Sequence, residues 1–128
     1  KVIEKEGQKL DLTINCLLQV HIADEKSKFG LSESEIQELL ASDEYAGMEH
    51  VRIKGLMGMA TYTDDIEQVR QEFKNLKRIF EGIKNDFFKD RDYFRDVSMG
   101  MSGDYNIAIE EGSTMIRVGS LIFGPRNY

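Results

Sequence analysis

Arg117 is the residue of this sequence that most strongly indicates a binding or catalytic role, because it is the only charged side chain in the otherwise apolar or β-branched residues 114–118. Such a run predicts a strand. In a parallel α/β sheet both faces are covered, so this guanidinium would be buried unless it lies at the carboxyl end of the strand. A buried guanidinium needs a partner, which indicates a carboxylate or a bound ligand. The alternative is an exposed strand end, where Arg117 pairs with a surface carboxylate.

Two turns that combine glycine with a hydroxyl favour a ligand over a surface ion pair. The first is Gly-Met-Ser at residues 100–102, and the second is Gly-Ser at residues 119–120. We expect each turn to lead from a strand into the start of a helix, where free backbone N–H groups bind anions. A (β/α) barrel holds phosphate in this way after its last two strands. The predicted anion site consists of Met101, Ser102, Gly119 and Ser120, with Arg117 beside it.

Alternating strand and helix patterns predict the elements that must position these turns. Apolar runs predict strands at residues 12–22, 51–60, 97–101 and 114–118. Helices are expected at residues 1–8, from Ser32, from Thr63 or Asp64, at residues 104–111 and from Gly119. Residues 43–50 are expected to be a simple connection. Strands that alternate with helices at this spacing pair in parallel, which predicts an α/β fold of about four βα units.

Polar and sulfur-containing residues on the first two expected strands are weaker candidates. Asn15, Gln19 and His21 share one face of the first strand, which is either the ligand side of a barrel mouth or a half-exposed face of a plain sheet. Met57 and Met59 share one face of the second strand, where methionine is more often core than ligand contact.

Composition restricts the classes of function. The 128 residues are 41% hydrophobic and 31% charged, as in a globular domain. A net charge of -6 with scattered Lys and Arg is unfavourable for nucleic acid. No apolar run reaches the ~18 residues of a membrane span. The single cysteine, Cys16, has no partner for an internal disulfide and is expected to be a buried, unreactive thiol in a reducing cytoplasm. We expect no metal site.

Three segments resemble the pyridoxal phosphate homeostasis protein family, single-domain relatives of the barrel domain of alanine racemase. They are SMGMSGDYNIAIEEGSTMIRVGSLIFGPRNY at the end of the chain, INCLLQVHIADEKSKFG at residues 14–30 and IKGLMGMA at residues 53–60. The resemblance covers nearly the whole chain. It implies a TIM-type (β/α) barrel, which takes eight units in about 250 residues. The 128 residues would then be the C-terminal half of a single cofactor-binding barrel domain.

The resemblance also implies roles for individual residues. Ser102 matches the hydroxyl that holds the phosphate of pyridoxal 5′-phosphate (PLP), and Gly119 with Ser120 matches the second phosphate turn. Arg117 matches the arginine that faces the pyridine nitrogen. A permanent cation there keeps the nitrogen unprotonated and makes the ring a weaker electron sink. The Schiff-base lysine belongs to the N-terminal half of such proteins, which has no counterpart in this sequence.

Three hypotheses about function therefore remain. The chain is part of a protein that binds PLP and maintains its intracellular level, without an assigned catalytic residue. Alternatively, it is a fragment of a racemase-type enzyme, or a half-barrel that serves as a phosphate-binding or assembly module. In each case four strands leave the barrel open. The expected partners are PLP and either the missing N-terminal half or a second copy of the chain.

Overall fold

The computed structural model describes residues 1–26 and 29–127. Within them, one sheet of four parallel strands has the order β1-β2-β3-β4. Its strands are β1 (Ile14–Val20), β2 (Val51–Gly58), β3 (Asp96–Met101) and β4 (Met115–Arg117). The helices are α1 (Val2–Leu10), α2 (Glu33–Ala41), α3 (Asp43–Ala46), α4 (Ile66–Phe87), α5 (Tyr105–Glu110) and α6 (Ser120–Phe123). The predicted alternation of strands and helices and the parallel pairing are confirmed.

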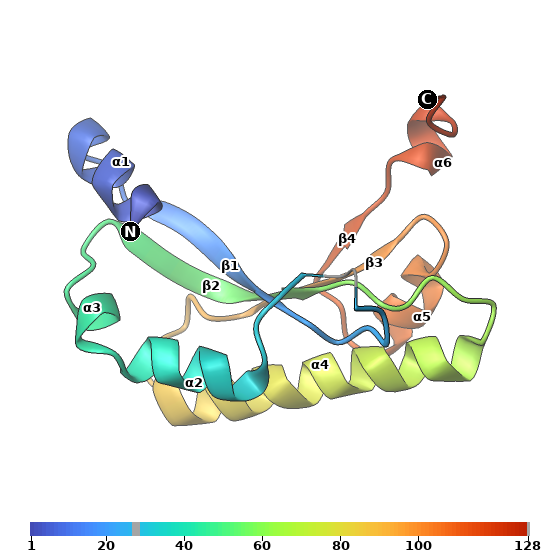
Figure 1. Ribbon diagram of the computed structural model, residues 1–128, viewed down its shortest axis with the longest axis horizontal. Coiled ribbons are helices and arrows are strands. Elements are labelled where there is room, and N and C mark those ends of the chain that lie inside the picture. The colour runs from blue at the N-terminus through green and yellow to red at the C-terminus, as the bar shows by residue number, and fades with distance from the viewer. Residues whose placement is uncertain (27–28, 128) are drawn as a thin grey trace.

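The helices cover one face of the sheet. Helices α2, α4 and α5 lie below the sheet in Figure 1, whereas α1 and α6 lie at its two ends. The described chain places no helix over the middle of the opposite face, which we call the open face. Val97 and Met99 of β3 point into the core on the helix side, so Ser98 between them points to the open face. Within these residues the sheet therefore differs from a complete parallel α/β sheet, in which both faces are covered.

The hydrophobic core lies between the sheet and the helix layer. The three- and four-residue periodicity correctly predicts which side chains of α4 are buried: Val69, Phe73, Leu76, Ile79, Phe80 and Ile83. Ile66 was expected in the same stripe but is 61% exposed, because it begins the helix one turn before the segment that packs on the sheet. Cys16 is half-buried against this core, and burial raises the pKa of its thiol.

Side-chain caps determine where two helices begin. Ser32 and Glu35 form the predicted capping box of α2, each accepting a hydrogen bond from the backbone N–H of the other. Helix α4 begins after Asp65 rather than at Thr63 or Asp64. The Asp65 carboxylate accepts a hydrogen bond from a backbone N–H in the first turn, which makes it the N-cap.

The first two strands are shorter than the apolar runs that predicted them. β1 ends at Val20, which pairs with Gly58 of β2 and also forms a parallel bridge to Leu31, ahead of α2, through backbone hydrogen bonds of Gln19 and His21 with Leu31. β2 ends at Gly58 rather than at residue 60. Residues 43–50 contain the short helix α3, so their expectation as a simple connection is wrong.

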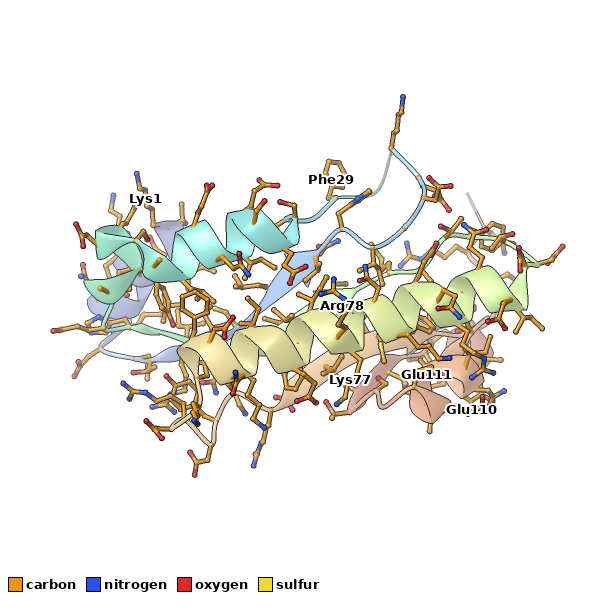
Figure 2. All side chains as sticks on the ribbon, turned by 90° about the horizontal axis from the view of Figure 1, so that it is seen from below. Lys1, Phe29, Lys77, Arg78, Glu110 and Glu111 are labelled. Carbon is orange, nitrogen blue, oxygen red and sulfur yellow. The ribbon has the colours of Figure 1, made fainter. Side chains whose placement is uncertain are left out.

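Ion pairs join α4 to its neighbours on the outer surface (Figure 2). Arg78 lies on the side of α4 toward α2 and pairs with Glu33 at 3.0 Å. Beyond the other side of α4, Glu110 and Glu111 each pair with Arg70 at 2.7 Å. An exposed pair such as that of Arg78 and Glu33 contributes about 0–1 kcal/mol. None of the described helices is long and apolar enough to cross a membrane.

Candidate ligand site at the carboxyl edge of the sheet

A cleft of about 1060 Å³ opens where β2, β3 and β4 end. Its walls come from residues 60–64 after β2, residues 101–104 after β3, and residues of β4, α6 and the segment that follows. Ligands of α/β folds bind at the carboxyl ends of parallel strands. All five residues predicted to form the site line this cleft: Met101, Ser102, Arg117, Gly119 and Ser120.

Arg117 reaches from β4 across the open face of the sheet. Its Nη1 donates a hydrogen bond to the hydroxyl of Ser98, and its Nη2 donates to the carbonyl oxygen of Gly58 at 3.2 Å. Burial lowers the pKa of the half-buried guanidinium, while the charge of Asp104 acts in the opposite direction. Arginine nevertheless stays protonated in proteins. Arg117 forms no ion pair with a carboxylate of the described residues, so pairing with a surface carboxylate is not its role in this structure.

The two predicted turns lie side by side. The hydroxyl oxygen of Ser102, after β3, accepts hydrogen bonds from the backbone N–H groups of Gly119 and Leu121, each at 3.4 Å. Ser120 is the first residue of α6, with Gly119 as its N-cap, as the sequence predicts. Backbone N–H groups and a hydroxyl therefore meet at one wall of the cleft.

The first turn differs from its prediction in one respect. Ser102 does not lie at a helix start, because α5 begins at Tyr105 and its N-cap is Asp104. The Asp104 carboxylate closes the turn by accepting a hydrogen bond from the backbone N–H of Met101 at 2.8 Å. The hydroxyl of Ser102 is thereby directed toward α6 rather than toward α5.

A hydrogen-bonded loop forms another wall of the cleft. The carboxylate of Glu72 on α4 accepts hydrogen bonds from the backbone N–H of Thr61 at 2.6 Å and from its hydroxyl at 2.8 Å. The Thr61 hydroxyl accepts from the N–H of Asp24, and Glu25 accepts from the N–H of Tyr62. These bonds hold the loops after β1 and β2 together. Sequence patterns gave no signal for this network.

The weaker candidates of the first two strands lie outside the cleft. Within the described residues that line it, Asn15, Gln19, His21, Met57 and Met59 are absent. Gln19 donates to the carbonyl oxygen of Phe29, and Nε2 of His21 lies 3.0 Å from the carbonyl oxygen of Glu25. Both side chains therefore stabilise the loop after β1. The sequence analysis missed Ser98, although a lone polar residue in an apolar strand is the same signal that identified Arg117.

Family comparison matches residues 1–127 to the family described as alanine racemase, N-terminal domain. The chain is 32% identical over 127 residues to the pyridoxal phosphate homeostasis protein of Aquifex aeolicus, covering 98% of this chain and 53% of that protein. It is 36% identical over 121 residues to the protein of the same name from Helicobacter pylori, covering 94% and 50%. The chain thus spans about half the length of these curated relatives.

Solved structures agree with this match. PipY of Synechococcus elongatus, solved without PLP, superimposes with a TM-score of 0.83 and 25% identity over 94% of this chain and 54% of its own. An unknown protein from Bifidobacterium adolescentis gives a TM-score of 0.81 and 30% identity over 94% of this chain and 47% of its own. A PipY structure with PLP bound has the same fold, with a TM-score of 0.79 at 24% identity. The chain belongs to the alanine racemase N-terminal domain family.

Proposed function

We propose that this chain forms the phosphate- and pyridine-binding side of a PLP site, in a protein that maintains intracellular PLP. The observation that carries the proposal is the guanidinium of Arg117, which faces the same cleft as the turns at Ser102 and Gly119 without a carboxylate partner among the described residues. The curated relatives are named pyridoxal phosphate homeostasis proteins, which supports this ligand.

The residues of the cleft fit such a ligand. Two of the five N–H donors of Arg117 bond to the described residues, which leaves the others for a ring nitrogen. Gly119 has no atom within 4 Å of the position that a Cβ would take, so a phosphate has room at this turn. Ser102 and Ser120 would add hydroxyl donors, and the exposed side chain of Met101 would cover the edge of the ring.

Arg117 would determine the chemistry available at this site. PLP supplies an electron sink when bound, and the strength of that sink depends on a proton at the ring nitrogen. A guanidinium beside this nitrogen opposes its protonation, because two positive charges would then be adjacent. No lysine lies among the described residues that line the cleft, so this chain offers binding and electrostatics rather than a nucleophile.

We further infer that the chain is the C-terminal half of one (β/α) barrel domain. Four parallel strands in chain order, helices on one face and, among the described residues, outer edges of β1 and β4 without a strand neighbour support this inference. The family half that carries the Schiff-base lysine, or a second copy of this chain, would cover the open face. Such a partner would place its residues opposite Arg117 across the barrel.

PLP retention by the complete polypeptide tests the proposal. After dialysis, we expect the wild type to keep its bound cofactor and the Arg117→Ala variant to lose it at least tenfold faster, since a charged contact of roughly 1.5–3 kcal/mol is removed. Arg78→Ala is the matched control, because it removes an arginine from the outer surface of α4. Equal retention by Arg117→Ala and wild type would overturn the proposed role of Arg117. Competition by inorganic phosphate but not by pyridoxal would instead favour the phosphate-binding module.

A further inference from the structure

Ser98 is a buried polar residue in the middle of the sheet. It is 1% exposed and lies in β3 between Val97 and Met99, which are both fully buried in the core. A hydroxyl removed from water is unfavourable unless it is hydrogen-bonded. Its partner is Nη1 of Arg117, which lies 19 residues later in the chain. Ser98 therefore contacts the very residue on which the proposed function depends.

Gly58 provides a second contact to the same guanidinium. The paired residues of β2 and β3 end at Met57 and Ser98, so Gly58 lies just beyond the ladder, and its carbonyl oxygen accepts from Nη2 of Arg117 at 3.2 Å. A Cβ at this position would lie 2.9 Å from the Cδ2 atom of Leu76 on α4, so a larger residue would require this side chain to shift. Two neighbouring strands thus hold the two terminal nitrogens of Arg117.

The pairing of β3 with β4 sets the distance that Arg117 spans. Ser98 pairs with Met115, but Arg117 pairs with Met101 rather than with residue 100. Between these two pairs, Met99 and Gly100 of β3 oppose the single residue Ile116 of β4, and Gly100 has a φ of 102°, which favours glycine. Because of this shift, Arg117 lies beside Met101 instead of Gly100, nearer the carboxyl edge of the sheet. Its side chain reaches back along β3 to the hydroxyl of Ser98.

We propose that the Ser98 hydroxyl and the Gly58 carbonyl are a positioning pair that aims Arg117 at an unprotonated ring nitrogen. Both acceptors are neutral, so they orient the guanidinium without cancelling its charge. A carboxylate at position 98 would offset that charge and would favour a proton on the ligand nitrogen. The inference rests on the proposed function and adds the residues that determine how the cation is presented.

A double-mutant cycle in the complete polypeptide tests this pairing. We expect Ser98→Ala to weaken the affinity for PLP by roughly three- to tenfold, because a hydrogen bond to a charged group is lost. We also expect it to shift the absorption band of bound PLP, because the guanidinium is no longer aimed at the ring. In the Arg117→Ala background, Ser98→Ala should change neither quantity, since its effect acts through Arg117. Ser98→Thr, which keeps the hydroxyl, should restore the wild-type band.

Ser113→Ala is the matched control. The Ser113 hydroxyl lies within hydrogen-bond distance of the carbonyl oxygens of Met99 at 2.7 Å and Met115 at 2.9 Å, between the same two strands, without contacting Arg117. It should lower thermal stability and leave the PLP band unchanged. Wild-type affinity and spectrum in Ser98→Ala, or the same loss with and without Arg117, would overturn the inference. Wild-type binding by Ser98→Ala alone would reject only this inference. Wild-type binding by Arg117→Ala would reject the proposed function as well, so the two failures are distinguishable.

Discussion

Gly55 allows β2 and β3 to approach each other closely. A Cβ at this position would lie 1.7 Å from the backbone oxygen of Asp96 in β3, and a backbone atom has little freedom to move away. We therefore expect Gly55→Ala to lower the free energy of unfolding by about 3 kcal/mol or more. Urea unfolding of the two proteins measures this difference.

Gly82→Ala provides the comparison for this substitution. Gly82 lies within α4, and no atom lies within 4 Å of a Cβ placed there. Alanine at this position should raise the free energy of unfolding by about 0.4–1 kcal/mol, because it restricts the unfolded chain without a clash. Similar effects of the two substitutions would contradict the argument from close strand approach.

Ser102 is expected to recognise phosphate rather than the ring of the ligand. Its hydroxyl bonds to N–H groups at the start of α6, whereas Arg117 lies at the other part of the cleft, on β4. Ser102→Ala should weaken binding of PLP roughly tenfold and leave binding of pyridoxal, which lacks the phosphate, unchanged. Equilibrium titration with both compounds tests the distinction. Equal losses for the two ligands would mean that Ser102 acts on the ring or on the fold.

At the scale of the elements, Glu4 attaches α1 to the segment before β2. Its carboxylate accepts hydrogen bonds from the backbone N–H of His50 at 2.8 Å and of Glu49 at 3.2 Å, and it contacts Nδ1 of His50 at 3.0 Å. Burial acts to raise the pKa of Glu4, but the hydrogen bonds from His50 and Glu49 outweigh it, so the pKa lies below its ordinary value of 4.5.

Acidification should therefore loosen α1. A carboxylate whose pKa is lowered by folding stabilises the folded state fully above its unfolded pKa. This stabilisation is lost as the pH falls below 4.5 and through the lower folded value. Glu4→Gln should flatten the acid limb of a plot of melting temperature against pH, and its difference from wild type should shrink toward low pH. A constant difference at every pH would exclude titration of Glu4 as the cause.

Helices, parallel strands and the capped start of α2 follow from local sequence patterns, whereas the end of β1 and the short helix α3 do not. The stripe from Val69 to Ile83 and the capping box at Ser32 involve residues three or four apart, so their physical cause lies within the segment that was read. The bridge between Val20 and Leu31 joins the end of β1 to a residue later in the chain, and α3 is a four-residue helix with no periodicity to detect. Such features depend on tertiary contacts.

The sequence predicts which residues form the candidate site but not the hydrogen bonds between them. Arg117 and the two turns are conspicuous because their residue types are unusual in apolar or strand-ending positions. The contact between Arg117 and Ser98 crosses a register irregularity between β3 and β4. The hydrogen bond between Thr61 and Glu72 joins the loop after β2 to α4. Neither follows from spacing alone, because each requires the packed sheet and helix layer.

Among the described residues, the sheet has one open face and two outer strands that each lack a strand neighbour on one side. Within the described chain β1 and β4 each have a single strand neighbour, and the open face carries no helix over its middle. Strand edges without a neighbour promote association with another strand. We expect the purified 128-residue chain to be dimeric or larger, or insoluble, at micromolar concentration. Sedimentation velocity measures its state, and a stable monomer that does not bind a hydrophobic dye would contradict the half-barrel inference.

The hydroxyl of Ser102 has a consequence for the rate at which a ligand enters and leaves. It accepts from Gly119 and Leu121 at 3.4 Å, so these donors are occupied by long, neutral bonds that a phosphate would replace with shorter, charge-assisted ones. Under the proposed function, these bonds to the hydroxyl would hold the turn in shape when the ligand leaves. Under the proposed function, exchange of the cofactor would be limited by breaking of its own contacts and escape from the cleft, which suits a protein that releases PLP as readily as it takes it up.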